Sequence, residues 1–288
     1  MVFRLVVLTL ITYFLMSSGT HYPGFGEISD VLGSNELMLT GLSSLIFVII
    51  LCRLNPLTSA SFIEIFSPQR FEKLFVPGFL HGAALALGIT LAFLLSGLYR
   101  YLGFYIQFDD VPLGLGNVFL RILGLGVLVY AEEYLFRKKI MGLLGRQIPA
   151  AWAAVITAIF YCVVKVIQFD LGLMHLMTLF LLSLTLATRT WADQDFVRGA
   201  GFWAGLLIVF HPLLSLPVLG DDFSGVLLIK YQAAADVLAE GESSTFRFLT
   251  GGAGGPLSSF ALQLVLLLFV CQSVFKNRKM LWTKLPGS

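Results

Sequence analysis

Charge is scarce in this sequence. Only 12% of its 288 residues are Asp, Glu, Lys or Arg, whereas 57% are hydrophobic. Soluble domains carry roughly 25% charged residues, so this composition excludes an ordinary soluble domain and predicts an integral membrane protein. The formal net charge of only +2 argues against a nucleic-acid partner, because contacts to a phosphate backbone need a marked basic excess.

Cysteine and histidine are also few. The three cysteines (Cys52, Cys162 and Cys271) are odd in number and stand among apolar residues. We therefore interpret them as small hydrophobic residues and not as a disulfide framework or a metal set. The four histidines are widely scattered along the chain, which makes a conventional metal site hard to assemble. The sequence thus predicts no metal site and no cofactor.

Long apolar runs take the place of charge. A bilayer core of about 30 Å needs about 20 apolar residues for each spanning helix. The runs predict an all-α, polytopic membrane protein with about eight transmembrane helices. They lie at residues 3–17, 37–52, 77–98, 117–136, 148–168, 173–188, 200–219 and 258–276. The first run has two interpretations, a retained helix, which we favour, and a signal peptide.

Basic residues concentrate in alternate loops. They are Arg4, Arg53, Arg70, Lys73, Arg137, Lys138, Lys139, Arg146, Arg189, Arg198 and four residues of the C-terminal tail. The intervening loops are mainly acidic. Cytoplasmic loops of membrane proteins carry the excess of Lys and Arg, so both termini are predicted to be cytoplasmic in a multi-pass protein of a cell membrane, such as a bacterial inner membrane.

The fourth run ends in "VYAEEYLFRKK", which carries two adjacent glutamates. Glu133 and Arg137 are four residues apart, so they share a helix face and can pair. Glu132 lies more than a turn deeper than the basic residues, and a charge at mid-helix costs about 2.5–3.5 kcal/mol on insertion scales. Two interpretations stay open: solvated charges beside the membrane, or glutamates held inside the protein for a purpose.

The Glu-Glu-x-x-x-Arg spacing resembles the first motif of the CAAX-protease and bacteriocin-processing (CPBP) family of intramembrane endopeptidases. The resemblance covers roughly residues 80–220 and includes "LFLLSLTLATRTWADQDFVRGAGFWAG". It implies that 77–220 form a CPBP-like helical core. Residues 1–76 would then hold N-terminal transmembrane helices and a cytoplasmic loop, and 221–288 an external loop and the last transmembrane helix.

The resemblance also implies a catalytic set. Its general base would be Glu132, beside Glu133 and Arg137, and a raised carboxyl pKa in a partly dry pocket suits such a base. Two histidines and an asparagine would follow, from Phe-x-x-x-His on the next helix and His-x-x-x-Asn two helices later, to stabilise an oxyanion. A divalent metal is implied only if the chain is an active enzyme.

The sequence departs from this pattern at the later motifs. Tyr161 and Lys165 occupy the Phe-x-x-x-His frame, while Trp203 and Leu207 stand where histidine and asparagine are expected. An ammonium inside an apolar helix should be paired, and Glu132 is its natural partner. The alternative is that Lys165 extends toward the outer face of the membrane.

One further arrangement is open, because "HPLLS" supplies His211 and Ser215 in a His-x-x-x-Ser frame. We expect a degenerate family member that binds membrane lipids and a transmembrane or lipidated protein partner, or serves as a membrane subunit of an assembly. The alternative is an active CAAX-type endopeptidase with Glu132 as its base. A transporter is disfavoured because few intramembrane charges are present to form a relay.

Overall fold

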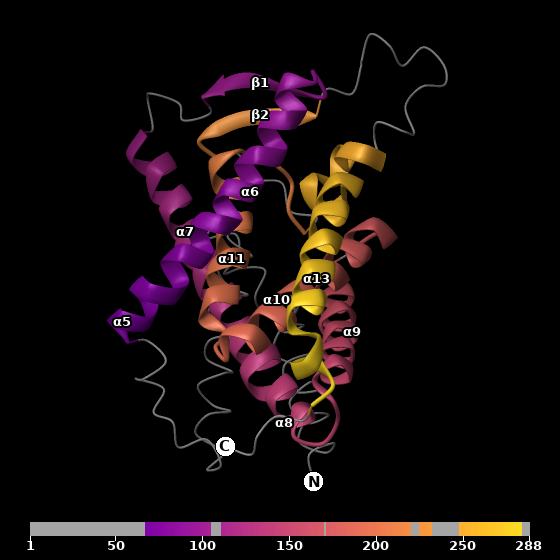
Figure 1. Ribbon diagram of the computed structural model, residues 1–288. Coiled ribbons are helices and arrows are strands. Elements are labelled where there is room, and N and C mark those ends of the chain that lie inside the picture. The colour runs from indigo at the N-terminus through magenta and orange to yellow at the C-terminus, as the bar shows by residue number, and fades with distance from the viewer. Residues whose placement is uncertain (1–66, 105–110, 170, 220–224, 232–247, 284–288) are drawn as a thin grey trace.

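The computed structural model describes residues 67–104, 111–169, 171–219, 225–231 and 248–283 (Figure 1). This part of the chain is mostly helical, and five of its helices are long and apolar enough to cross a membrane. They span Pro68–Leu95, Gly114–Gly145, Ala150–Ile167, Leu173–Asp193 and Phe260–Arg278. The predicted runs at 3–17 and 37–52 lie outside the described residues.

The first described helix begins earlier than expected. It is continuous through α5 (Pro68–Arg70), the π-helical η2 (Phe71–Phe75) and α6 (Val76–Leu95). The side chain of Ser67 accepts a hydrogen bond from the backbone N–H of Arg70, and Pro68 suits the first helical position. Hydropathy placed the start at 77 because the first turns are charged; the cap shows that the helix starts before them.

Most of the remaining helices are joined by short connections. They are α7 (Val111–Glu133), the π-helical η4 (Tyr134–Met141), α8 (Gly142–Gly145), α9 (Ala150–Gln168), α10 (Leu173–Asp193), α11 (Val197–Ile208), the π-helical η5 (Val209–Leu213) and α13 (Phe260–Leu281). In Figure 1 the chain descends through α7, and α10 packs against both α9 and α13. The predicted helix at 200–219 is shorter in the structure, where η5 ends next to Pro212 and is followed by a turn.

A small sheet was not predicted from the sequence. Strand β1 (Tyr99–Phe104) pairs antiparallel with β2 (Leu227–Tyr231) and covers the upper end of the bundle in Figure 1. The phenolic O–H of Tyr99 donates to the carbonyl oxygen of Thr250 at 3.1 Å. Burial, and to a smaller extent the nearby Tyr231, raise the pKa of Tyr99, so the phenol stays neutral at this end of the molecule.

Glycines bring α6 and α11 into backbone contact. Gly78 and Gly82 on α6, and Gly201 and Gly205 on α11, each follow the small-x-x-x-small spacing that lets helices approach closely. A Cβ added at Gly82 would overlap the carbonyl oxygen of Phe202 and lie 2.9 Å from its carbonyl carbon. Gly88, six residues further along α6, differs: an added Cβ there would meet no described atom of a neighbouring element within 4 Å.

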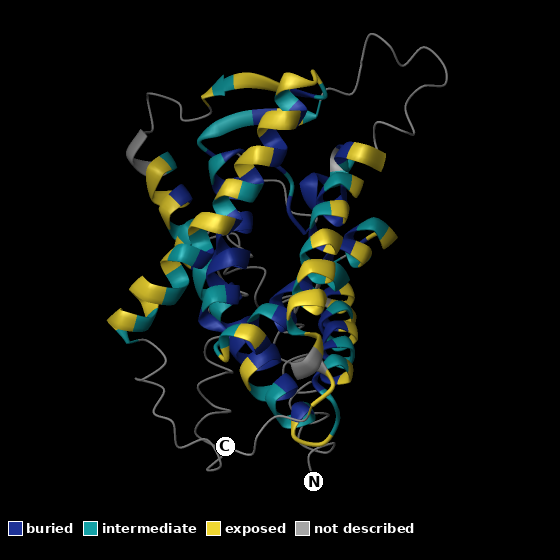
Figure 2. Ribbon diagram, viewed as in Figure 1, coloured by how far each residue is buried: buried dark blue, intermediate teal, exposed yellow. Residues whose placement is uncertain are grey.

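The burial pattern has the form expected of a membrane bundle. Figure 2 shows buried residues along the inward faces of the helices and exposed ones along the outer face of α6. Leu80, Leu87 and Leu91 on that face are each more than half exposed. Helix α11 is the opposite case, since all of its residues except Arg198 are buried.

The segment "TGGAGGP" is folded onto the bundle and is not a plain flexible turn. It forms two short 3₁₀ turns, η6 (Gly252–Gly254) and η7 (Pro256–Ser258). His175, at the start of α10, hydrogen-bonds through Nε2 to the carbonyl oxygen of Gly254 at 2.9 Å. Gly251 and Gly255 have positive φ, which glycine adopts without strain.

Candidate functional site

The candidate site lies where α7 passes into η4 and packs beside α9 and α10. Glu132 and Glu133 are the last residues of α7, and Arg137 is on η4. Tyr161 and Lys165 are four residues apart on α9, so both side chains project from one face of that helix. We call Glu132, Glu133, Arg137, Tyr161 and Lys165 the charge cluster.

Glu132 is held by two side chains of α9. The Lys165 ammonium lies 2.5 Å from Oε1 of Glu132, and the Tyr161 hydroxyl donates to Oε2 at 3.2 Å. Glu132 and Lys165 are each only 1% exposed. The structure therefore confirms the predicted pair and rules out the alternative in which Lys165 extends to the outer face.

Glu133 forms a second pair within the cluster. Its Oε2 accepts a hydrogen bond from Nε of Arg137 at 3.2 Å, and both side chains are fully buried. Nη2 of Arg137 also donates to the hydroxyl of Ser183 on α10 at 2.9 Å. The interpretation as solvated juxtamembrane charges is therefore wrong for Glu132, Glu133 and Arg137, because the bundle closes around them. Sequence reasoning missed Ser183, because α10 also carries hydroxyl side chains at Thr178, Thr185, Thr188 and Thr190 and nothing local distinguishes Ser183 from them.

Tyr161 connects the two pairs. Its ring lies 5.6 Å from Nζ of Lys165 and 5.5 Å from Cζ of Arg137, and Phe136 meets it edge-on at 5.1 Å. Cations within about 6 Å of an aromatic ring are attracted by its electron-rich face. Tyr161 thus combines a hydrogen bond to Glu132 with aromatic contacts to both cations.

Some polar atoms of the site lack partners among the described residues. They are Oε1 of Glu133, Nη1 of Arg137 and Oγ1 of Thr190. An added Cβ at Gly199 would lie 3.6 Å from Oε2 of Glu133 and 3.7 Å from Oγ1 of Thr190, so the carboxylate and the hydroxyl flank this glycine. Buried polar atoms of this kind are where an internal water or a polar ligand group binds.

Trp203 and Leu207, two further residues singled out in the sequence, are on α11. Both are fully buried, and the indole N–H of Trp203 has no hydrogen-bond partner in the described ranges. Within those ranges no hydrogen bond from either residue reaches the charge cluster.

His211 and Ser215 are placed in and just after η5. Nδ1 of His211 lies 3.3 Å from the carbonyl oxygen of Leu216, and Oγ of Ser215 accepts a hydrogen bond from the backbone N–H of Gly225 at 2.7 Å. Both side chains are thus hydrogen-bonded to nearby backbone. In the part of the chain with described placement, no three His, Cys, Asp or Glu side chains form a group that could hold a metal ion.

Comparisons of the chain with models of protein families, with curated proteins and with solved structures find no match. The site is therefore judged by its own geometry. Two buried carboxylates, one ammonium and one guanidinium form neighbouring ion pairs inside a helical bundle, at the end of α7.

Proposed function

We propose that this protein is a CPBP-like membrane protein without peptidase activity, a pseudoprotease with about eight transmembrane helices. The observation that supports it best is the engagement of both Glu132 oxygens, by Nζ of Lys165 and by the hydroxyl of Tyr161. A general base needs a lone pair directed at the attacking water. On Glu132 the lysine and the phenol bind the carboxylate from the positions where the family would place histidine and phenylalanine.

A structural role fits the same geometry. Buried ion pairs inside a membrane are costly and mark sites of function or specificity. We propose that the bundle binds a transmembrane or lipidated protein partner, or acts as a membrane subunit of an assembly. The charge cluster would then hold α7, η4, α9 and α10 in one arrangement that presents the binding surface.

The decisive experiment is a peptidase assay of the purified protein in detergent or nanodiscs. Peptides and prenylated peptides serve as substrates, with Glu132→Ala as the matched control. We expect equal background cleavage from both proteins. A rate that falls in Glu132→Ala while the variant keeps its fold would contradict the pseudoprotease proposal.

An active endopeptidase is the second candidate, and one observation favours it. Oε1 of Glu133 has no partner among the described residues, so one buried carboxylate oxygen of the motif is available to a water or a substrate group. If this oxygen supports catalysis, the unmodified protein should cleave the substrates, and Glu133→Gln and Glu132→Ala should both abolish the cleavage. Absence of cleavage in the unmodified protein removes this candidate.

The membrane orientation is part of the proposal. The alternation of basic and acidic loops supports cytoplasmic termini. A reporter fused after Ser288 should read cytoplasmic, and one inserted in the loop 220–257 should read external. The opposite readings would invert the orientation and put the charge cluster near the other face of the membrane.

A further inference from the structure

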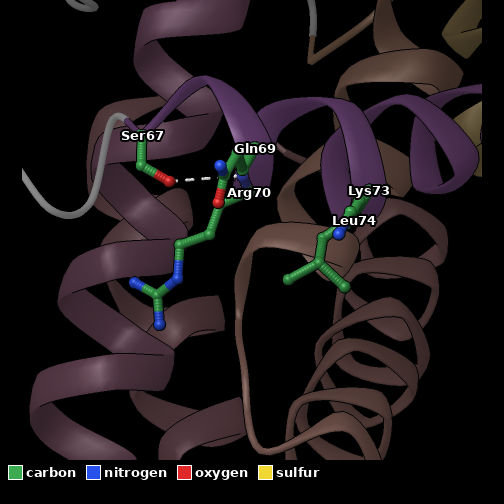
Figure 3. A pocket seen from close by; sticks show the side chains of 5 residues that line it. All are labelled: Ser67, Gln69, Arg70, Lys73 and Leu74. Atoms are coloured by element: carbon green, nitrogen blue, oxygen red, sulfur yellow. Dashed lines mark hydrogen bonds between the residues drawn. The ribbon is translucent and has the colours of Figure 1, made fainter.

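A second polar site lies away from the charge cluster, at the start of the helix that contains α6. Here a hollow of about 560 Å³ is lined by Ser67, Gln69, Arg70, Lys73 and Leu74 (Figure 3). Figure 3 shows Arg70 and Leu74 extending from the same side of the helix. None of these residues belongs to the CPBP-like motifs, so the proposed function leaves the hollow unexplained.

The described lining of the hollow is basic. Among the residues that the structure describes, it contains two cations, Arg70 and Lys73, and no acidic side chain. Arg70 is anchored by Asp195, 3.1 Å away on the turn before α11. Lys73 is exposed and makes no ion pair with a described residue. The first turn of a long helix also carries a partial positive charge. An anionic group is therefore favoured at Lys73.

Exposed apolar side chains lie further along the same helix. Leu80 is seven residues, or about two turns, after Lys73 and belongs to the exposed face of α6. Leu87 and Leu91 follow at spacings of seven and four, which keep them on that face, and all three are more than half exposed. A molecule that fits both surfaces has an anionic head and long apolar chains.

We propose that the hollow binds the headgroup of an anionic phospholipid, whose acyl chains lie along the exposed face of α6. Basic pockets at the ends of transmembrane helices are known to bind acidic headgroups, and a Lys or Arg near the surface contributes on the order of a fivefold gain in affinity. Lys73 supplies a positive charge without an ion pair to a described residue, and Arg70 supplies one that is paired with Asp195. Ser67 and Gln69 supply polar groups for the phosphate oxygens. This site is independent of whether Glu132 is catalytic.

The experiment measures lipid binding to the purified full-length protein by native mass spectrometry, with phosphatidylglycerol and phosphatidylcholine as probes. The test variant is Lys73→Gln. The matched control is Lys138→Gln, which removes the same charge from another exposed lysine, on η4. We expect phosphatidylglycerol to bind more tightly than phosphatidylcholine, and Lys73→Gln to weaken it about fivefold, while Lys138→Gln leaves it unchanged.

Competition with inorganic phosphate separates a lipid site from a simple anion site. We expect millimolar phosphate to leave phosphatidylglycerol binding intact, because it lacks the acyl chains that contact α6. Displacement by phosphate would overturn the assignment to a lipid. Equal losses in Lys73→Gln and Lys138→Gln, or no preference for the anionic lipid, would overturn the site itself. Melting of each variant without added lipid confirms that it is folded.

Discussion

Two of the contacts between helices in this bundle are built in opposite ways. Between α6 and α11 the side chains are removed: glycines on both helices let backbone meet backbone. Where α7 and η4 meet α9 and α10 the side chains are long and charged. Lys165 of α9 pairs with Glu132 of α7, and Arg137, paired with Glu133 on its own helix, reaches Ser183 of α10. Both contacts are buried, yet the first is damaged by adding atoms and the second by removing them.

The difference reflects what each contact contributes. In a membrane, helices gain little from the hydrophobic effect, so close packing and polar interactions hold them together. The glycine contact uses dispersion over short distances and has no charge to leave uncompensated. The charge cluster connects three helices through specific partners. If one member of an ion pair is lost, the other is left as an uncompensated buried charge that destabilises the fold.

The largest effect is expected from Lys165→Met. This change leaves Glu132 without its cation in a closed bundle, and removing one partner of a buried pair costs about 3–5 kcal/mol. Detergent melting of the variant beside the unmodified protein measures the loss.

The double variant Lys165→Met with Glu132→Gln is the control for that effect. It removes both charges and should recover much of the lost stability, because no ion remains unpaired. Losses that simply add would show that the pair seen at 2.5 Å contributes nothing as a pair.

A comparable loss is expected from Arg137→Ala. Arg137 is fully buried and serves both Glu133 and Ser183, so its removal leaves a carboxylate unpaired at a cost of about 3–5 kcal/mol. Lys138→Ala, one residue along and exposed, is the matched control and should melt like the unmodified protein. Equal melting of Arg137→Ala would favour solvated charges after all.

The glycine contact should be broken by Gly82→Ala. The added methyl group meets backbone atoms of Phe202, which cannot rotate away, and overpacking of this kind costs about 1–3 kcal/mol. The control is Gly88→Ala on the same helix, where the new Cβ would meet no described atom of a neighbouring element within 4 Å. It should be neutral or slightly stabilising, since alanine favours helix more than glycine does. Similar melting of both variants would show that α6 and α11 are not in close contact.

A loss similar in size to that of Gly82→Ala is expected from Tyr161→Phe. It keeps the ring against Lys165 and Arg137 but removes the hydrogen bond to Glu132, and hydrogen bonds to charged groups contribute about 1.5–3 kcal/mol. The loss should therefore lie below that of Lys165→Met. A loss as large as that of Lys165→Met would mean that the phenol, and not the ammonium, is the main partner of Glu132.

The sequence predicted the positions of the helices better than the contacts between elements that are distant in the chain. Apolar runs located five of the membrane-length helices within a few residues at most ends, because hydropathy and length depend on local sequence alone. It placed the start of the first described helix too late and the end of α11 too far along, since charged first turns and a proline-containing end carry weak hydropathy signals. The sheet of β1 and β2 was missed because its strands lie far apart in the chain and pair only in the fold.

The sequence by itself determined the class of protein, the positions of its apolar helices and the need of Lys165 and Arg137 for carboxylate partners. Those conclusions follow from the free-energy cost of a charged side chain in an apolar environment. The sequence alone shows which charged residues stand within apolar runs. Only the tertiary structure decided that Glu132 meets Lys165 and Tyr161 together, that Ser183 joins Arg137, and that α6 touches α11 through glycine. Contacts between helices depend on their relative position and rotation, and many arrangements of the same helices satisfy the same hydropathy pattern.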